Sequence, residues 1–141
     1  MNTTKMLIAA LLGGIINFLT GWLVYGILLK DAMNKAMTPE ANALNKPEPN
    51  LLGIFIACFI SSFLLSYIFE RWAGIRTFIG GMTAGALIGF LIAASIDIQF
   101  WSMLNMFSTP SFMIVDVAAS TVITAISGGV IGWFLGYNRK D

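Results

Sequence analysis

The stretch TFIGGMTAGALIGFLIAASI, residues 77–96, decides the fold of this chain, and Asp97 follows it directly. It contains no charged residue, and a helix of about 20 such residues crosses the roughly 30 Å hydrocarbon core of a bilayer. Small residues recur at every fourth position of the stretch, at Gly81, Gly85, Gly89 and Ala93. The pattern predicts a membrane helix with one face of small side chains, and such a face lets a second helix approach closely.

The composition of the whole chain agrees with a membrane environment. Of its 141 residues, 57% are hydrophobic and 11% are charged, whereas soluble domains carry about 25% charged residues. So few charges cannot cover a surface that faces water, and we therefore expect the lipid bilayer as the surrounding medium. The formal net charge of +1 gives no reason to expect a nucleic-acid partner.

Three further apolar stretches are long enough to cross a bilayer, at about residues 6–29, 51–69 and 111–137. With residues 77–96 they predict an all-α membrane protein, in which four transmembrane helices form one bundle. We expect residues 1–141 to make a single integral membrane domain.

The connecting segments carry helix signals of their own. Thr38 before Pro39 has the form of an N-cap followed by proline at the first helical position, and Asn50 can cap the second span. Residues 70–76 are expected to form a tight turn. Residues 97–111 mix apolar and polar side chains, which suits a segment at the membrane interface.

The basic residues predict the orientation of the spans, because cytoplasmic loops carry an excess of lysine and arginine. With both termini in the cytoplasm, the inner side holds Lys5, Arg71, Arg76, Arg139 and Lys140. The outer side then holds Lys30, Lys35 and Lys46. The predicted location is the inner membrane of a bacterium.

Glycine-rich stripes are the candidate helix-packing surfaces of the first, third and fourth spans: Gly21, Gly81, Gly85, Gly89, Gly128, Gly132 and Gly136. In an antiparallel pair, Gly81 and Gly85 are expected to lie level with Gly132 and Gly136. Each step of four residues also turns about 40° around a helix. We therefore expect the outer half of the stripe in the third span, from Gly89 to Asp97, to face something other than the fourth span. The stripes suit either packing within one bundle or a homo-oligomer interface.

Four polar residues in or near the spans form the candidate polar or proton site: Asn17, Tyr25, Asp97 and Asp116. Ionisable groups at membrane depth are functional candidates, and two carboxyl groups that meet can share a proton. The alternative is structural. Asp116 lies near a helix N-terminus, where a negative charge is favoured, and Asp97 could cap an interfacial helix that starts at Ile98. For Asn17 we expect a hydrogen bond to another helix, with a solute site as the alternative.

The sequence gives no sign of enzyme chemistry. It contains no histidine, and Cys58 is its single cysteine, so a metal or haem site built from these residues has no ligands. It also contains neither a nucleophile elbow nor a glycine-rich phosphate loop with lysine. We therefore predict no enzymatic activity, no cofactor and no metal site.

The first span carries a resemblance to a known family. Gly13-Gly14, Asn17, Gly21-Trp22 and Tyr25-Gly26, followed by Lys30-Asp31-Ala32-Met33, resemble the opening of small bacterial four-span membrane proteins of unknown function, the DUF1761-like family. The likeness covers about the first quarter of the chain, and Leu23-Val24 separate a tryptophan and a tyrosine that are adjacent in the usual pattern. The resemblance implies four spans and no assigned activity.

Two main functions fit these features. The first is a non-enzymatic membrane protein that acts through helix association, as a homo-oligomer or as an accessory subunit of another membrane protein. The second is transport of a small solute or of protons through the outer-leaflet acids. An enzyme that acts on lipid or quinone is a third and weaker alternative.

Overall fold

The fold was analysed in a computed structural model that describes residues 3–137. The described residues are helical apart from their connections, and the elements are α1 (Thr3–Gly21), η1 (Trp22–Leu28), α2 (Lys30–Ala36), α3 (Pro39–Ala43), α4 (Leu51–Ile68), η2 (Phe69–Ala73), α5 (Phe78–Met103) and α6 (Ser111–Gly136). The two η elements are short π-helices that prolong α1 and α4.

Four helical stretches are long and apolar enough to cross a membrane: Thr3–Leu28, Leu51–Ala73, Phe78–Met103 and Ser111–Gly136. Large apolar side chains on their outer surfaces, such as Leu19, Ile60 and Leu87, are half or more exposed. An exposed apolar surface of this extent suits lipid rather than water. The prediction of an all-α integral membrane protein with four spans is therefore confirmed.

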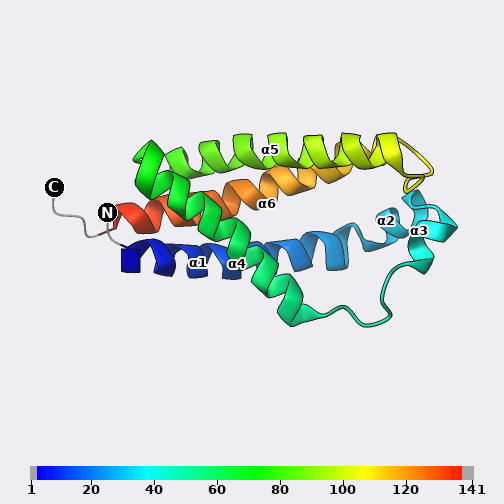
Figure 1. The fold of residues 1–141 in the computed structure, drawn as a ribbon, viewed down its shortest axis with the longest axis horizontal. Coiled ribbons are helices and arrows are strands. Elements are labelled where there is room, and N and C mark those ends of the chain that lie inside the picture. Colours follow the sequence, from blue (N-terminus) through cyan, green and yellow to red (C-terminus); the bar gives the residue numbers. More distant parts are fainter. Residues whose placement is uncertain (1–2, 138–141) are drawn as a thin grey trace.

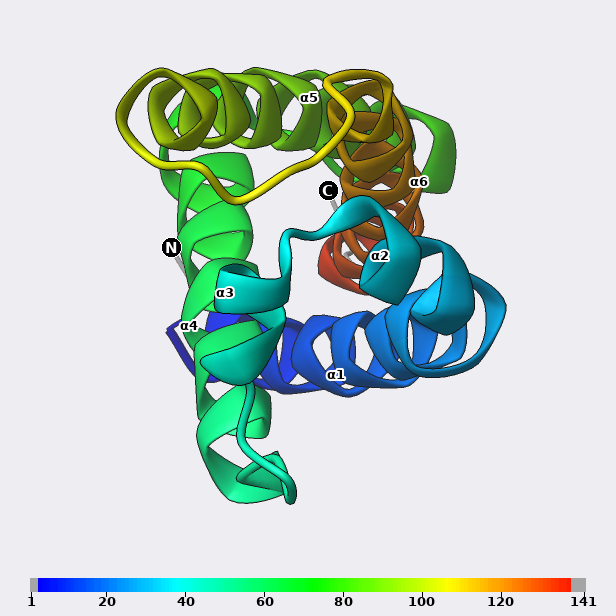
Figure 2. The same ribbon diagram turned by 90° about the vertical axis from the view of Figure 1, so that its right-hand side faces the viewer.

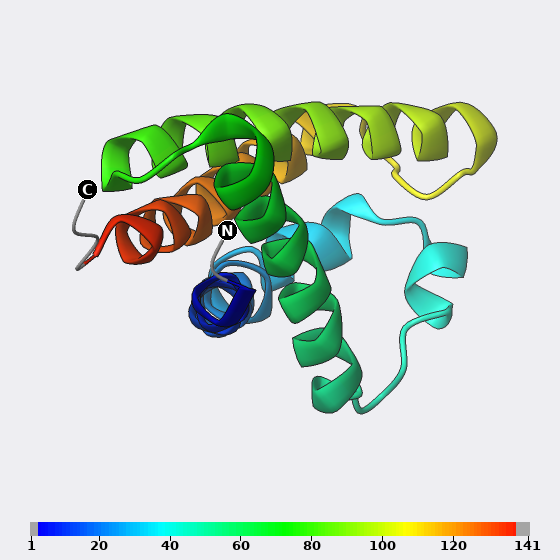
Figure 3. The ribbon, with the colours of Figure 1, turned by 60° about the vertical axis from the view of Figure 1, so that its left-hand side comes forward.

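The four spans form two pairs, α1 with α4 and α5 with α6, and α6 also packs against α1. Figure 1 shows α1 beginning and α6 ending at one end of the bundle. We call this the turn end, because the short connection at residues 74–77 lies there. The opposite end, called the loop end, carries residues 29–50 and 104–110. Seen from the loop end, α5 and α6 lie across the bundle from α1 (Figure 2). Helix α4 crosses the bundle obliquely, and its start points away from α5 (Figure 3).

Side chains cap the helices where the sequence predicted it. The hydroxyl of Thr38 accepts a hydrogen bond from the Ala41 amide, and the Asn50 side chain accepts one from the Gly53 amide at 3.0 Å. Thr38 also joins the two loop-end segments, because its amide donates to the Met106 carbonyl at 2.9 Å. The loop end is therefore tied together by backbone hydrogen bonds.

The third span is longer than predicted, and Asp97 lies within it. Helix α5 continues to Met103, so residues 98–103 are helical rather than a separate interfacial segment. The prediction that Asp97 caps a new helix is therefore wrong. The physical reason is that no proline or glycine lies between Asp97 and Met103 to stop the helix.

The predicted turn after α4 is shorter than expected. The helix continues as η2 to Ala73, and Gly74 then reverses the chain with φ 62°, in the left-handed region that favours glycine. An ion pair between Glu70 and Arg76 closes the turn. Helix α6 starts after Pro110 without a side-chain cap.

Glycine contacts join α5 to α6, but with a different offset from the one predicted. A Cβ added at Gly85 would lie 2.5 Å from the Thr124 carbonyl oxygen and 3.2 Å from the Gly128 Cα. Gly81 faces Gly128 and Gly132, whereas Gly136 faces the backbone of Arg76. The predicted pairing of Gly81 and Gly85 with Gly132 and Gly136 is therefore wrong by about one helical turn along α6. A stripe that repeats every fourth residue fits its partner almost equally well after a slip of one turn.

The outer part of the glycine stripe also departs from the prediction. A Cβ added at Gly89 would lie 2.6 Å from the Thr124 Cβ, so Gly89 still packs on α6. Beyond Gly89, Asp97 still lies beside Asp116 of α6, so the outer part of the stripe also faces the fourth span. In α1, Gly21 has no atom within 4 Å of an added Cβ, so it does not pack against another helix of this chain. Gly14 packs in this way instead, with a Cβ position 3.1 Å from the Phe59 backbone.

Buried serine side chains fix the turn end of the bundle. The Ser127 hydroxyl donates to the Gly13 carbonyl at 3.0 Å and lies 3.3 Å from the Ser62 hydroxyl. The Ser66 hydroxyl donates to the Met6 carbonyl at 2.8 Å. All three serines are fully buried beside a core of Ala9, Leu65, Phe69, Ile131 and Leu135. The turn end is thus closely packed, and its buried hydroxyls are paired.

Candidate functional site

One face of α6 supplies polar groups to the loop half of the bundle. Asp116, Ser120 and Thr124 are spaced four residues apart, so they lie on neighbouring turns of the same face. Tyr25 reaches this face from η1. Its hydroxyl lies 2.9 Å from the Ser120 hydroxyl and donates to the Asp116 backbone carbonyl at 3.3 Å. A π-helical segment often marks a functional position, and η1 turns Tyr25 toward α6.

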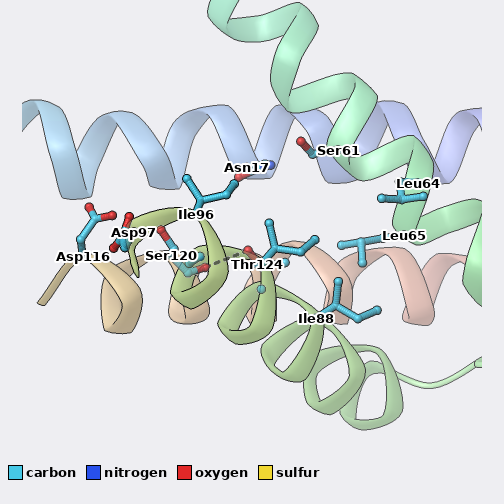
Figure 4. A pocket seen from close by; sticks show the side chains of 13 residues that line it. Asn17, Ser61, Leu64, Leu65, Ile88, Ile96, Asp97, Asp116, Ser120 and Thr124 are labelled. Carbon is cyan, nitrogen blue, oxygen red and sulfur yellow. Dashed lines mark hydrogen bonds between the residues drawn. The ribbon is translucent and has the colours of Figure 1, made fainter. Parts of the chain in front are cut away.

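Asp97 brings a second acid to the same place from α5. The two carboxyl groups lie beside each other and interact electrostatically; Figure 4 shows Asp97 next to Asp116. Asp97 is only 7% exposed. Its Oδ2 atom is buried and has no hydrogen-bond partner among the residues that the structure describes. A buried acceptor without a partner is costly to a fold, so this group calls for an explanation beyond stability.

A cavity of about 300 Å³ opens beside the two acids. Each of the four spans contributes to its lining, and its polar groups come from Asn17, Ser61, Asp97, Asp116, Ser120 and Thr124. Its remaining walls are mostly aliphatic, with Leu65, Ile92 and Ile96 among them. Figure 4 shows the acids at one end of this cavity and the leucines of α4 at the other. The site thus combines one charged end with an apolar interior.

A second cavity of about 530 Å³ adjoins the first. The two share the lining residues Asn17, Ser120 and Thr124. The second cavity is richer in aromatic groups, with Phe18, Trp22 and Tyr25 in its walls. Tyr25 therefore connects the two cavities, because its ring lines the second while its hydroxyl contacts Ser120 at the edge of the first.

The charges in the two cavities are unbalanced. Asp97 and Asp116 line the first cavity, and no lysine or arginine is among the lining residues of either cavity. Two adjacent carboxylates in an apolar environment repel each other and lose hydration. A proton or a cation held between two such groups would reduce this repulsion. The adjacent acids without a neighbouring base distinguish the site.

The structure brings together the four residues that the sequence singled out. Asn17, Asp97 and Asp116 line the first cavity, and Tyr25 contacts the Asp116 backbone. The predicted hydrogen bond from Asn17 to another helix is absent among the described residues, and the Asn17 side chain faces both cavities instead. Asp116 still lies in the second turn of α6, so the helix dipole also favours its charge.

Ser120 and Thr124 also line the site, although they are not among the residues predicted from the sequence. A usable signal was present, because both follow Asp116 at four-residue intervals and so share its face of the helix. Ser61 of α4 lines the cavity too and is likewise not among the predicted residues. No local pattern marks it, since its position depends on the oblique path of α4.

Comparisons with known proteins give one match. A family profile described as "Protein of unknown function (DUF1761)" matches residues 8–132. No curated protein and no solved structure matches the chain. The likeness drawn from the first span is therefore confirmed over most of the chain.

Proposed function

We propose that this chain, which belongs to the DUF1761 family, transports a small solute or protons across the membrane, with Asp97 and Asp116 as the groups that take up the charge. The family description assigns no activity, so the proposal is supported by the cavity alone. One observation carries it: the buried Asp97 carboxyl lies beside a second acid, with one oxygen unpaired, in a cavity of the membrane-spanning part. Ionisable groups in such positions mark ion and substrate pathways in membrane proteins.

The arrangement of the helices is compatible with alternating access. The first cavity lies between the α1–α4 pair and the α5–α6 pair, toward the loop end. At the turn end, glycine contacts and paired serines leave the bundle closely packed. Transport would therefore require one helix pair to rock against the other, as repeats do in many secondary transporters.

Proteoliposomes that contain the full chain and a pH-sensitive dye in the lumen test this proposal. An imposed membrane potential should drive proton uptake by the wild type. We expect Asp97→Asn and Asp116→Asn each to reduce the uptake to the level of protein-free liposomes, because each removes one acid of the pair. The control is Asp31→Asn, which changes an exposed acid of α2 outside the site. Proton uptake that is absent from the wild type, or unchanged in both site variants, would refute proton transport.

Helix association is the alternative function. It was predicted from the small-residue stripes, as a homo-oligomer or a complex with another membrane protein. In this structure Gly81, Gly85, Gly128 and Gly132 contact one another within a single chain. They are therefore not available to a partner while the bundle is intact. A native gel of the detergent-solubilised chain checks this function, and a lone monomeric band would count against it.

We also propose that the turn end faces the cytoplasm, in the inner membrane of a bacterium. Of the basic residues in the described part, Lys5, Arg71 and Arg76 lie at the turn end and Lys30, Lys35 and Lys46 at the loop end. The predicted excess on the turn side rests on Arg139 and Lys140, which lie outside the described residues. Labelling of a cysteine introduced at Ser108, in a Cys58→Ser background, by a membrane-impermeant reagent tests this orientation. We expect labelling of intact spheroplasts.

A further inference from the structure

We infer that the ligand of this site is an organic cation with one positive charge and an apolar body. This inference rests on the proposed function and adds its substrate class. The cationic group would lie beside Asp97 and Asp116 in the first cavity, and the apolar body would lie in the second, aromatic cavity. Three observations support it: the charge of the acid pair, the aliphatic walls of the first cavity, and the lining residues that the two cavities share.

The acid pair matches a single positive charge. Asp97 and Asp116 are the acids that line the first cavity, and neither cavity has a lysine or arginine in its lining. When the two carboxyl groups share one proton, the pair carries one negative charge. The unpaired Oδ2 of Asp97, buried beside the cavity, then remains as an acceptor for a cationic N–H or a positively charged methylammonium group. A monovalent cation would restore neutrality in this apolar environment.

The lining favours an organic cation over a divalent metal ion, because it carries only two carboxyl groups and aliphatic walls. Calcium takes six to eight oxygen ligands and magnesium about six, mostly from carboxylates and water. Within the described residues no group of three or more histidine, cysteine, aspartate or glutamate side chains could hold a metal. Opposite the acids the walls are aliphatic, with Leu65 and Ile92 among them. Such walls suit an alkyl or aryl group better than a hydrated ion.

The second cavity provides a matching place for the apolar body. Its walls include Phe18, Trp22 and Ile54, and its volume of about 530 Å³ is in the range of small-molecule sites. Phe18 packs edge-to-face on Phe55 with ring centroids 5.9 Å apart, which holds its ring in place. Aromatic rings also attract organic cations through their faces. A ligand with its charge at one end can therefore occupy both cavities across Asn17 and Ser120.

Binding to the purified full chain in detergent, measured by calorimetry, tests the inference with benzyltrimethylammonium as the probe. We expect the probe to bind the wild type, and its affinity to fall more than about tenfold in the double variant Asp97→Asn/Asp116→Asn, because this variant removes both acids from the charged end. The control Asp31→Asn should bind as the wild type does. Benzamide and benzoate have a similar ring without the positive charge, and we expect no binding of either.

A second arm tests the aromatic cavity. Phe18→Ala should weaken binding of benzyltrimethylammonium severalfold and leave that of tetramethylammonium unchanged, because the smaller cation has no aromatic body. Short-chain phosphatidylcholine, added below its micelle concentration, distinguishes a soluble cation from a lipid headgroup with the same ammonium chemistry. If this lipid displaces the probe, the natural ligand is a lipid with an ammonium headgroup. The ligand would then still belong to the inferred class, a positively charged group with an apolar body.

A measurement on the wild type guards against variants that do not fold. Dicyclohexylcarbodiimide modifies protonated carboxyl groups in apolar surroundings, and peptide mass mapping locates the label. We expect benzyltrimethylammonium to slow labelling of Asp97 and Asp116, and benzamide to have no effect. Equal binding of benzamide and the cation, or unchanged binding in the double acid variant, would overturn the inference. Proton uptake that needs both acids, without any binding of the cations, would also overturn it and leave proton transport intact. Cation binding without proton uptake would refute proton transport alone.

Discussion

At the turn end of the molecule, α5 contacts α6 through Gly81 and Gly85, whereas at the loop end the buried side of α5 carries Asp97 beside a cavity. The buried hydroxyls of the turn end are paired across helices, as in Ser127 with Gly13. At the loop end one buried carboxylate oxygen has no partner among the described residues. In lipid, close backbone contact and interhelical hydrogen bonds drive helix association. The comparison indicates that the turn end supplies stability and that the loop end carries the polar site.

The difference between the two ends follows from helix geometry. Successive small residues at four-residue spacing turn by about 40° each around a helix. Glycine contacts with α6 run from Gly81 to Gly89, and beyond them Ala93 and Asp97 line the cavity while Asp97 lies beside Asp116 of α6. Helix α4 does not fill the space, because it crosses the bundle obliquely (Figure 3). One periodic stripe thus produces a tight contact at one end and a lined cavity at the other.

The largest predicted effect is a loss of stability when the turn-end contact is disturbed. In Gly85→Ala the new methyl group would meet the Thr124 carbonyl and the Gly128 Cα, both of which belong to the helix backbone and cannot rotate away. We expect a loss of about 2–3 kcal/mol of unfolding free energy, as for overpacked cores. Gly21→Ala is the matched control, because nothing lies within 4 Å of its added Cβ. Reversible unfolding in mixed micelles measures both, and equal effects would remove the contrast between the two positions.

The next effect has the opposite sign. Asp97→Leu removes a buried carboxyl group that lacks a partner for one oxygen, and its aliphatic side chain suits the apolar walls of the cavity. We expect a gain of about 1–2 kcal/mol in unfolding free energy together with loss of proton uptake, since an unpaired buried polar group destabilises a fold. Thermal unfolding in detergent measures the gain. A destabilised Asp97→Leu variant would show that the acid has a structural role and would weaken the contrast between the two ends.

The sequence predicted those parts of this molecule that depend on local chemistry. Hydropathy located four spans, and the side chains of Thr38 and Asn50 located two helix starts. The offset between α5 and α6 could not be predicted, because a stripe with a four-residue repeat also fits after a slip of one turn. The cavity could not be predicted either. It depends on the oblique path of α4 and on the approach of Tyr25 to Ser120, which lie 95 residues apart in the chain.

A smaller effect concerns the hydrogen bonds of the turn end. Ser127→Ala removes the donor to the Gly13 carbonyl and the contact with the Ser62 hydroxyl, both of which are buried. We expect a loss of about 1 kcal/mol, because interhelical hydrogen bonds in membranes contribute roughly 0.6 kcal/mol on average and the Ser62 hydroxyl loses its contact with Ser127. Ser102→Ala is the control, since the Ser102 hydroxyl is exposed and bonds to its own helix at Ile98. A loss no greater than that of the control would mean that glycine contacts alone fix this end.

The smallest predicted effect lies at the boundary of the two cavities. Tyr25→Phe keeps the ring in the wall of the second cavity and removes the hydroxyl that contacts Ser120 at 2.9 Å. Ser120 also lines the first cavity, which is large and polar enough to admit water as a replacement partner. We therefore expect a loss of only about 0.5 kcal/mol in unfolding free energy, at the low end for a net hydrogen bond. The control is Tyr67→Phe, whose ring packs on Trp72 away from the cavities. A hydroxyl that water can replace contributes little to the free energy of unfolding. If Tyr25→Phe loses as much unfolding free energy as Ser127→Ala, water does not replace the Tyr25 hydroxyl, and the loop end is as stable as the turn end.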